Sequence, residues 1–444
     1  MRFGIFVKAA ARPCGLCVPH VIDRGRKAMP DITLVIPMYN VERYISLCLD
    51  SVRAQTLANI EAICVDDGST DGTAQIAEQH AALDGRIRVI RKDNGGVSSA
   101  RNAGIRAAAG TFVMFVDSDD CLEPQACERV LELFRSRAAD VVVYGTHVVP
   151  ATAEDDWFRR RLAPRDVYYE AFEPAVLFKE CSHPYPWHAA VRRAFLIEND
   201  LLFDETVLYG EDEVFHFEMY PLARGVLFTS EKLYRYRVFR SQSLMDDRAH
   251  AYVKMVREHV YVVDRILRAW RQRGFFGSCD EQVVKHLLAF VVFDIGNLDQ
   301  ADRAACYAEL GAALVRNCPE VVAQLRACGG ALGSVVGMLA DASVAAGGEV
   351  RAEAEAGAGL PGDFGALFRV RCMLAVWGAG GTVRETVRAV RSRADALRRR
   401  SAAFRRRDAE LRVQDDEALR ASLARLEAES AAAAGARPAG EEGE

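Results

Sequence analysis

Short apolar runs alternate with longer stretches of helical spacing over residues 31–145. The runs are apolar throughout, which is typical of strands buried on both faces of a parallel sheet. The predicted strands are Ile32–Ile36, Ile60–Val65, Ile87–Ile90, the run that begins at Thr111, and Val141–Tyr144. The predicted helices are Val41–Gln55 with Asn40 as its N-cap, one that ends at Leu83, Val97–Ala108 and Glu123–Ser136. Strands that alternate with helices of this length predict an α/β fold with a right-handed, mostly parallel sheet.

The order of elements becomes less regular after Pro150. Helical spacing covers Glu173–Glu180, Arg193–Asn199 and Asp212–Leu222, and strand patterns cover Val226–Thr229 and Leu233–Val238. From about residue 247 to 327 the spacing is helical throughout, which predicts an all-α region. We therefore expect a lead-in at residues 1–28, an α/β domain at 29–245, a helical domain at 246–327 and a Gly- and Ala-rich linker at 328–365.

Apolar or small residues recur at alternating steps of four and three between Val383 and Leu411, and arginines crowd the other faces. We expect a long amphipathic or coiled-coil helix within residues 366–430, followed by a disordered acidic tail at 431–444. Three roles stay open for this arginine-rich helix. It can be a solvated helix that pairs with its own acidic tail, a surface helix on anionic lipid, or a means of self-association.

Composition and charge exclude several classes of protein. Half of the 444 residues are hydrophobic and 27% are charged, so the chain can bury a large core. The net charge of -5 argues against a nucleic-acid-binding protein. No run of about 18 apolar residues occurs, so we expect no membrane span.

The cysteines and the first residues add two expectations. The 12 cysteines are scattered, and several fall in apolar strand or helix patterns, which predicts a reducing, cytoplasmic setting. Cys14 and Cys17 form a lone C-x-x-C pair near His20, and no second pair is spaced to complete a zinc site. Residues 1–28 lack the unbroken apolar core of a signal peptide. Met29 lies directly before the first predicted strand and is our predicted initiator.

Polar turns follow successive predicted strands, and the carboxyl ends of parallel strands meet at one edge of a sheet. The turns contain Pro37, Tyr39 and Asn40 after the first strand, Asp66–Ser69 after the second, and Asp117, Asp119 and Asp120 after the fourth. Each turn alone is ordinary turn chemistry, but their coincidence favours a site. Carboxylates this close need a counter-charge or raised pKa values, and a hard divalent cation that bridges substrate phosphates can supply the counter-charge. The turn Asn94–Gly96 opens a helix whose N–H groups, with Arg101, could meet phosphate.

Four motifs in this region carry a resemblance to a known family. They are I-T-L-V-I-P-M-Y-N at residues 32–40, E-A-I-C-V-D-D-G-S-T-D-G-T at 61–73, N-G-G-V-S-S-A-R-N-A-G at 94–104 and F-V-D-S-D-D at 115–120. In this order they resemble glycosyltransferase family 2, whose members are inverting enzymes of the GT-A fold that use nucleotide-diphospho sugars. The resemblance is close over residues 31–145 and looser to about residue 245. It implies a GT-A catalytic domain at 29–245.

The resemblance also implies roles for individual residues. The nucleotide-sugar site would contain Pro37, Tyr39, Asn40, Asp67, Gly96, Arg101, Asp117 and Ser118. Within it, Asp67 would hydrogen-bond the base, and Asp117 would contact ribose or metal. Asp119 would hold Mn²⁺ or Mg²⁺ against the diphosphate. For Arg101, helix packing is an equally good interpretation.

A general base must accept the proton of the attacking hydroxyl group. The segment Tyr209–Phe215 resembles the family's Glu-Asp motif, which makes Asp212 the predicted base with Glu211 beside it. The alternative is an acid-rich helix start that the helix dipole favours.

The resemblance departs from the family pattern on the acceptor side. Its candidates are Trp187, Glu211 and Asp120. Trp187 lies where relatives often have Trp-x-Lys, but Ala189 stands at the lysine position. A place in the core explains Trp187 equally well.

The expected activity is transfer of one sugar from a nucleotide-diphospho sugar, with a UDP-sugar favoured, to a hydroxyl group. The expected acceptor is a growing cell-surface polysaccharide or a lipid-linked glycan, in the cytoplasm or at the inner face of the membrane. Two other hypotheses stay open. A catalytically inactive nucleotide-sugar-binding scaffold would keep Asp67 and Asp119 but need no base. A nucleotidyltransferase would release pyrophosphate, but the first turn lacks a Gly-rich phosphate loop with lysine.

Overall fold

The computed structural model describes residues 29–149, 156–182, 184–238 and 252–349, together with Ala421, Ala424, Arg425 and Ala428. Several predictions lie outside these residues. They concern the lead-in at 1–28 with its C-x-x-C pair, the arginine-rich stretch at 383–411 and the acidic tail at 431–444. The choice of Met29 as initiator stays a prediction.

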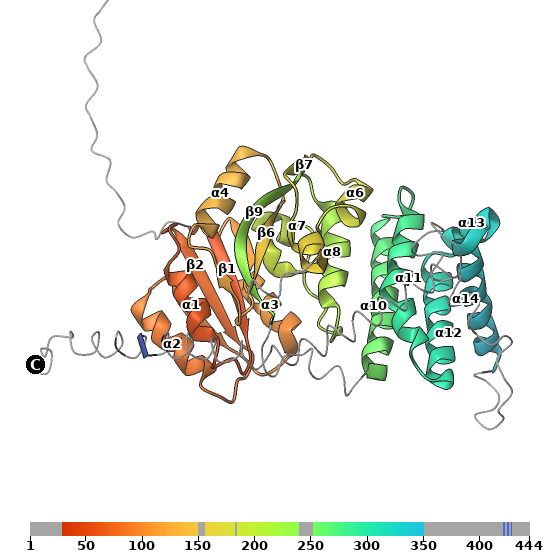
Figure 1. Cartoon of the computed structure of the whole chain (residues 1–444), viewed down its shortest axis with the longest axis horizontal. Coiled ribbons are helices and arrows are strands. Elements are labelled where there is room, and N and C mark those ends of the chain that lie inside the picture. Colours follow the sequence, from red (N-terminus) through yellow and green to blue (C-terminus); the bar gives the residue numbers. More distant parts are fainter. Residues whose placement is uncertain are drawn as a thin grey trace, which may run out of the picture.

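A nine-stranded sheet forms the centre of the α/β part (Figure 1). The strands are β1 (Ile32–Met38), β2 (Ile60–Asp66), β3 (Ile87–Arg91), β4 (Phe112–Phe115), β5 (Cys121–Leu122), β6 (Val141–Val149), β7 (Val167–Tyr169), β8 (Ala189–Arg192) and β9 (Val226–Arg237). Their order is β3-β2-β1-β4-β8-β6-β9-β5, and β7 pairs with β9. The first four strands are parallel. Because β8 is antiparallel to both β4 and β6, strands β6 and β9 again run with the first four. The predicted mostly parallel α/β sheet is therefore confirmed.

Helices cover both faces of this sheet. They are α1 (Ile45–Arg53), α2 (Thr73–Leu83), α3 (Gly96–Ala107), α4 (Ala126–Ser136), α5 (Asp156–Leu162), α6 (Pro174–Phe178), α7 (Arg193–Glu198) and α8 (Glu211–Leu222), with a 3₁₀ turn at Pro186–His188. Leu34 and Ile36 pack with α1, α2 and α4 on one face, whereas Val35 packs with α3, α7 and α8 on the other. Since alternate residues of a strand point to opposite faces, strands covered on both sides must be apolar throughout, as the sequence shows.

Five further helices form the all-α region that the spacing predicts. They are α10 (Tyr252–Arg273), α11 (Asp280–Gly296), α12 (Gln300–Asn317), α13 (Pro319–Cys328) and α14 (Gly330–Glu349). Helix α10 stands beside α8, the other four helices follow on its far side, and together they continue the core of that face of the sheet (Figure 1). The fully buried Trp270 of α10 donates from its indole nitrogen to the backbone oxygen of Phe217 in α8 at 3.0 Å. The helical region and the α/β part therefore share one apolar core.

The linker predicted at residues 328–365 is wrong over Gly330–Glu349, which is helix α14. Its small residues serve close packing between helices. A Cβ atom on Gly311 of α12 would lie 1.9 Å from the backbone oxygen of Leu339, and one on Gly333 would lie 2.1 Å from that of Leu325. Glycine at these positions lets the backbones of neighbouring helices touch. The Gly- and Ala-rich composition, which is typical of linkers, therefore belongs to a closely packed helix in this protein.

Two local predictions also differ from the structure. Helix α1 begins at Ile45 rather than Val41, and Asn40 is not its N-cap. Asn40 instead has a positive φ of 51°, and its side-chain oxygen accepts from the backbone N–H of Thr70 at 2.8 Å. The two strands predicted at Val226–Thr229 and Leu233–Val238 are one continuous strand, β9.

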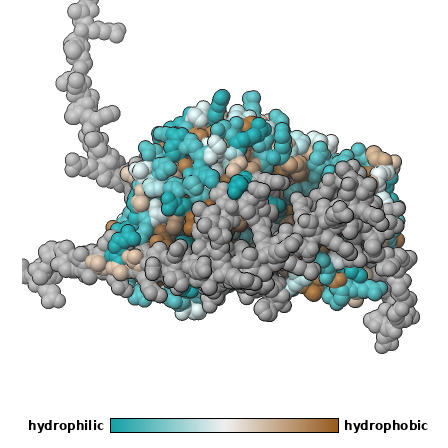
Figure 2. Space-filling model, viewed as in Figure 1, coloured by the Kyte–Doolittle hydropathy of each residue, from teal (hydrophilic) through white to brown (hydrophobic). Residues whose placement is uncertain are grey.

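Within the described ranges, no helix is both long and apolar enough to cross a membrane. The face shown in Figure 2 is mainly hydrophilic over the described α/β part, with smaller apolar patches between the polar residues.

Candidate active site

The loops that follow β1 and β2 are locked together. The backbone N–H of Asn40 donates to the Ser69 hydroxyl at 3.1 Å, and its side-chain oxygen accepts from Thr70. Glu42 accepts from the backbone N–H of Gly72 at 2.8 Å. Because the two loops hold each other, the turn that the sequence assigned to the nucleotide has a fixed shape.

Pro37 and Tyr39 lie two residues apart, but Pro37 is buried in the core and Tyr39 is at the surface. Pro37 is buried within β1, where it pairs with Val65 of β2. Tyr39 follows two residues later and is 50% exposed. Its ring is therefore available at the carboxyl end of the strands to stack on a flat ligand, whereas Pro37 shapes the loop from below.

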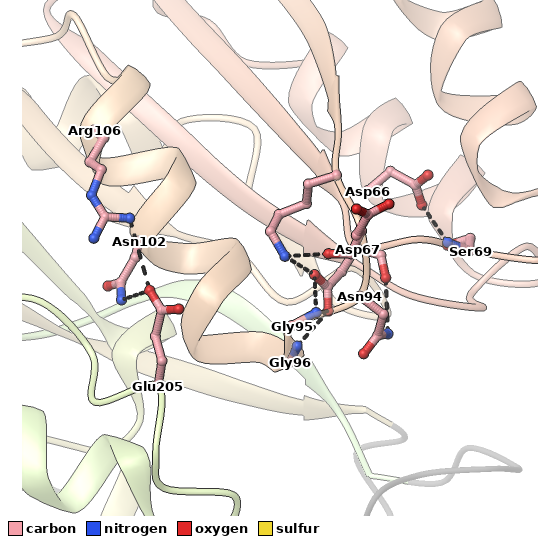
Figure 3. Close-up of polar contacts among 11 residues, drawn as sticks. Asp66, Asp67, Ser69, Asn94, Gly95, Gly96, Asn102, Arg106 and Glu205 are labelled. Atoms are coloured by element: carbon pink, nitrogen blue, oxygen red, sulfur yellow. Dashed lines mark hydrogen bonds and ion pairs between the residues drawn. The ribbon is translucent and has the colours of Figure 1, made fainter.

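Asp67 organises the turn before α3 (Figure 3). Its carboxylate accepts from the Lys92 ammonium at 2.5 Å and from the backbone N–H groups of Gly95 at 3.0 Å and Gly96 at 2.7 Å. Gly96 has a positive φ of 87°, a conformation that favours glycine. These two N–H groups, which the sequence led us to expect at a phosphate, face Asp67 instead. Lys92 is a site residue that sequence reasoning missed, because nothing in its position distinguishes it from a surface lysine.

Asp117, Ser118 and Asp119 follow β4 at the same edge of the sheet. The side chains of Asp117 and Asp119 are half-buried, whereas Ser118 is buried. The guanidinium of Arg237 in β9 donates to the backbone oxygen of Asp119 at 2.9 Å. The buried Tyr234 hydroxyl accepts from the backbone N–H of Asp117 at 3.0 Å. These two contacts from β9 hold the loop after β4 in place.

Asp120 has a different place from its two neighbours. It is 1% exposed, and its carboxylate accepts from the Tyr234 hydroxyl at 2.9 Å and from the backbone N–H of Arg237 at 2.7 Å. Burial, together with the charges of Asp119 and Asp117, raises the pKa of Asp120 well above its usual value. Its buried contacts with β9 do not place it at an acceptor.

Trp187 is also placed in the core. It is 3% exposed, and its ring stacks on three tyrosine rings with centroid distances of 5.0 Å to Tyr185, 4.7 Å to Tyr234 and 4.9 Å to Tyr236. Of the two interpretations of this tryptophan, the structure agrees with packing rather than with stacking on a sugar.

Arg101 joins the motif after β4 to the motif at the start of α8. Its guanidinium lies 3.2 Å from Asp117 Oδ1 and 2.9 Å from Glu211 Oε1, and it sits 5.1 Å above the ring of Phe203. The residue is only 5% exposed. Burial alone would lower the pKa of Arg101, but the two carboxylates outweigh it and raise this pKa. Arg101 is therefore a buried ion-pair partner rather than a free phosphate ligand.

Three carboxylates occupy the first turn of α8, where the helix dipole favours negative charge. Glu211 pairs with Arg101, and Glu213 Oε2 lies 3.8 Å from His286 Nε2 of α11. Asp212, between them, accepts from the backbone N–H of Glu213 at 3.0 Å. Burial and the charges of Glu211 and Glu213 raise the pKa of Asp212 well above its usual value, against the opposing effect of Arg101. A carboxylate with a raised pKa is the stronger proton acceptor near neutral pH.

The described residues contain no group of three or more His, Cys, Asp or Glu side chains placed to hold a metal ion alone. Asp117 and Asp119 offer half-buried oxygen ligands two residues apart. Such a pair suits Mg²⁺ or Mn²⁺, because these ions commonly take one or two carboxylates and complete their shell with water and substrate phosphates.

A family model described as "Glycosyl transferase family 2" matches residues 33–199, which include the carboxyl ends of β1, β2 and β4 but not the start of α8. The chain carries a glycosyltransferase family 2 domain. Glycosyltransferase EpsJ of Bacillus subtilis, itself uncharacterized, is 36% identical over 217 residues, which are 47% of this chain and 61% of EpsJ. Chondroitin synthase of Escherichia coli is 40% identical over 121 residues, which are 27% of this chain and 18% of that protein. The chain thus spans less than two thirds of the length of either relative.

The GT-A fold of the family 2 domain also occurs in a solved structure. The structure of Staphylococcus aureus TarS, residues 1–349, in complex with UDP-GlcNAc has a TM-score of 0.58 and 20% sequence identity. It covers 71% of this chain and 88% of the TarS chain. The coverage includes more of this chain than the α/β part, so the likeness in fold extends beyond the sheet.

Proposed function

We propose that the chain is an inverting glycosyltransferase that moves one sugar from a nucleotide-diphospho sugar to a hydroxyl group of a growing glycan. The observation that carries this proposal is the bridge made by Arg101 between Asp117 and Glu211. It brings the acidic strand end, suited to a diphosphate and its cation, beside a helix start that carries a carboxylate of raised pKa, Asp212. The family 2 domain supports the same chemistry.

In the proposed reaction, Asp212 accepts the proton of the acceptor hydroxyl as its oxygen attacks the anomeric carbon. The new bond forms on the face opposite the diphosphate, so the bond to the leaving phosphate oxygen breaks with inversion. The proton ends on Asp212, and the electron pair leaves with the nucleoside diphosphate. Glu211 and Glu213 are held by partners on α3 and α11, which leaves Asp212 as the best candidate for the base.

In this proposal, different residues of the chain bind different parts of the donor. Tyr39 offers an exposed ring to the base, and Asp67 and Asn40 fix the loops around it. A role for Asp67 in hydrogen-bonding the base stays a prediction, because its carboxylate already accepts from three donors. Asp117 and Asp119 would hold Mn²⁺ or Mg²⁺, which when bound neutralises the charge that develops on the departing diphosphate.

A UDP-sugar is the favoured donor, and a cell-surface polysaccharide or lipid-linked glycan the favoured acceptor. TarS, which has a similar fold, is described in complexes with UDP and UDP-GlcNAc. The relative that matches 27% of this chain is named chondroitin synthase. We place the reaction at the cytoplasmic side of the membrane, because nucleotide sugars are made in the cytoplasm. Contact with the membrane surface, or self-association, through the arginine-rich helix remains part of the proposal.

A donor screen tests this function. The full chain is incubated with UDP-, GDP- and dTDP-sugars, with Mn²⁺, with Mg²⁺ and with a chelator, and nucleoside diphosphate release is measured. We expect release from one nucleotide class, dependent on the divalent cation, and NMR of the released sugar should show the inverted anomer first. Binding without any release would favour the inactive scaffold, and pyrophosphate release would favour a nucleotidyltransferase.

A further inference from the structure

The residues that lead into α8 belong to no helix or strand, and their position depends on side-chain contacts. We call residues 203–210 the base segment, because they connect the region after α7 to Glu211, the first residue of α8. Asp212 is the second residue of α8, so the direction of its side chain follows from the way the base segment enters the helix. Phe203 anchors the other end, with its ring stacked on Phe215 at a centroid distance of 4.1 Å.

Helix α3 holds one side of the base segment (Figure 3). The side-chain amide of the buried Asn102 donates to the backbone oxygen of Phe203 at 2.8 Å and accepts from its N–H at 2.8 Å. The same amide donates to Glu205 at 2.9 Å, and Arg106 lies 3.9 Å from Glu205. Helix α3 therefore contacts Phe203 and Glu205, which are odd-numbered residues of the segment.

Helix α10 of the helical region holds the other side, through the even-numbered residues. The pairs are Asp204 with Arg265 at 2.5 Å, the Thr206 hydroxyl with the Tyr261 hydroxyl at 3.0 Å, and the Leu208 N–H with Glu258 at 2.8 Å. Gly210 completes the row, since a Cβ there would lie 3.2 Å from Val262, and its φ of 92° favours glycine. The four α10 residues follow one another at steps of three, one and three positions and therefore lie along one face of the helix.

Arg265 makes the charged contact in this row. Its Nε and Nη2 atoms both reach Asp204 Oδ2, at 2.6 Å and 2.5 Å, and the Asp204 side chain is 11% exposed. The other oxygen of Asp204 accepts from the backbone N–H of Thr206 at 2.9 Å and from its hydroxyl at 2.6 Å. Arg265 thus fixes a carboxylate that itself shapes the turn of the base segment.

We propose that α10 positions the general base: its face of Glu258, Tyr261, Val262 and Arg265 clamps the base segment against α3, with Arg265 as the positioning residue. The inference rests on the proposed function, because a base needs positioning only if transfer occurs. It gives the helical region a part in the reaction, although no α10 residue needs to touch the substrate. Misplacement of a reacting group by about 1 Å can cost up to about a hundredfold in rate.

The first test compares Arg265→Ala with Arg268→Ala in the full chain. Arg268 lies on the same helix and pairs with Asp264 at 2.7 Å, but that pair does not touch the base segment, so Arg268→Ala is the matched control. We expect Arg265→Ala to lower kcat about ten- to a hundredfold, with KM for the donor and Kd for UDP within about twofold of wild type. Arg268→Ala should leave all three unchanged. An equal effect of the two variants on kcat would overturn the inference.

A second measurement does not need activity. Hydrogen–deuterium exchange of the backbone amides at 203–210 should be faster in Arg265→Ala than in wild type and unchanged in Arg268→Ala. The conservative variant Arg265→Lys, which keeps a positive charge facing Asp204 and leaves the bonds from Asp204 to Thr206 in place, should recover at least half of the lost protection. If no nucleotide sugar is turned over by wild type, the proposed function fails, whereas the exchange data still decide about the clamp. Unchanged exchange in Arg265→Ala would contradict the clamp itself.

Discussion

Arg101 and Glu211 are 110 positions apart in the chain, and their side chains form an ion pair with 2.9 Å between Nη1 and Oε1. The same guanidinium lies 3.2 Å from Asp117. Because Arg101 is 5% exposed, water competes little for these contacts. The acidic strand end and the start of α8 are therefore held at a fixed separation, and the proposed reaction takes place between them.

Replacing Arg101 should destabilise the fold as well as the site. Arg101→Met leaves Glu211 and Asp117 without their buried partner, so we expect the free energy of unfolding to fall by about 3 kcal/mol. Arg106→Met is the matched control on the same helix, because the Arg106 side chain is 59% exposed and lies 3.9 Å from Glu205. Its effect should stay below about 1 kcal/mol. Urea unfolding of both variants makes the comparison, and equal midpoints would show that the Arg101 bridge contributes little.

Asp212→Asn should stabilise the protein near pH 7. The pKa of Asp212 is raised in the folded state above its usual value of 3.8, so its charge opposes folding at neutral pH. The stability that this group contributes is fully present below pH 3.8 and is lost as the pH rises through the raised pKa. The advantage of the asparagine variant should therefore shrink as the pH falls toward that value. Denaturation curves of both proteins across this range measure it.

Asp84→Asn supplies a control of opposite sign. Burial alone would raise the pKa of Asp84, but its hydrogen bonds and ion pair with Arg86 outweigh this and lower it. The charge of Asp84 therefore stabilises the fold at neutral pH, and this contribution is present above its unfolded pKa and lost as the pH falls through the lowered one. Asp84→Asn should thus destabilise at pH 7. If both asparagine variants shift stability in the same direction, the assigned pKa direction of Asp212 is wrong.

Asp119 and Asp120 are neighbours after β4, but replacing them should have different effects. Asp120→Ala should lower stability, whereas Asp119→Ala should remove the effect of the metal ion. Asp120 is 1% exposed and accepts two hydrogen bonds from β9, so Asp120→Ala should cost about 1–3 kcal/mol in the free energy of unfolding. Asp119 is half-buried, and Asp119→Ala should change stability by less than about 0.5 kcal/mol. It should instead abolish the effect of Mn²⁺ on the affinity for UDP. Calorimetric titration of UDP with and without Mn²⁺ checks this, and an intact Mn²⁺ effect in Asp119→Ala would refute the metal assignment.

Gly311→Ala tests whether α14 is packed as described. A Cβ atom at Gly311 would lie 1.9 Å from the backbone oxygen of Leu339, so the helices must separate, and we expect a loss of about 3 kcal/mol or more. Gly85→Ala is the control, because nothing lies within 4 Å of a Cβ there. Thermal unfolding should show a clearly lower Tm for Gly311→Ala only. Two equal Tm values would mean that α12 and α14 do not approach this closely.

The sheet was predictable because its strands are apolar on both faces, and β1 and β2 appear within two residues of their predicted ends. Short elements were not. Strand β8, Ala189–Arg192, has only four residues and no periodic pattern, and β5 has two. The start of α1 was misplaced because Asn40 bonds to Thr70 across the sheet edge, a contact between residues 30 positions apart that local spacing cannot indicate.

The candidate site was predictable to the level of motifs but not of partners. Strand order places the turns after β1, β2 and β4 at one edge, as the sequence implies. The sequence does not show that Lys92 forms an ion pair with Asp67. Nor does it show that Arg101 pairs with carboxylates, where phosphate was one predicted partner. These partners depend on the packing of α3 against segments up to 110 positions away. The sequence also does not show that residues of α10 contact the segment before α8. That contact joins the α/β part to the helical region, which the sequence pattern predicts as separate domains.

The transfer rate of Asp212→Asn, measured beside its affinity for UDP, decides whether Asp212 is the general base. Asparagine keeps the size of the side chain but cannot accept the proton. We expect nucleoside diphosphate release and sugar transfer to fall by about 10²–10⁴-fold, while Kd for UDP stays within about twofold. Undiminished transfer by Asp212→Asn would show that Asp212 is not the base, since the proton would then leave by another route.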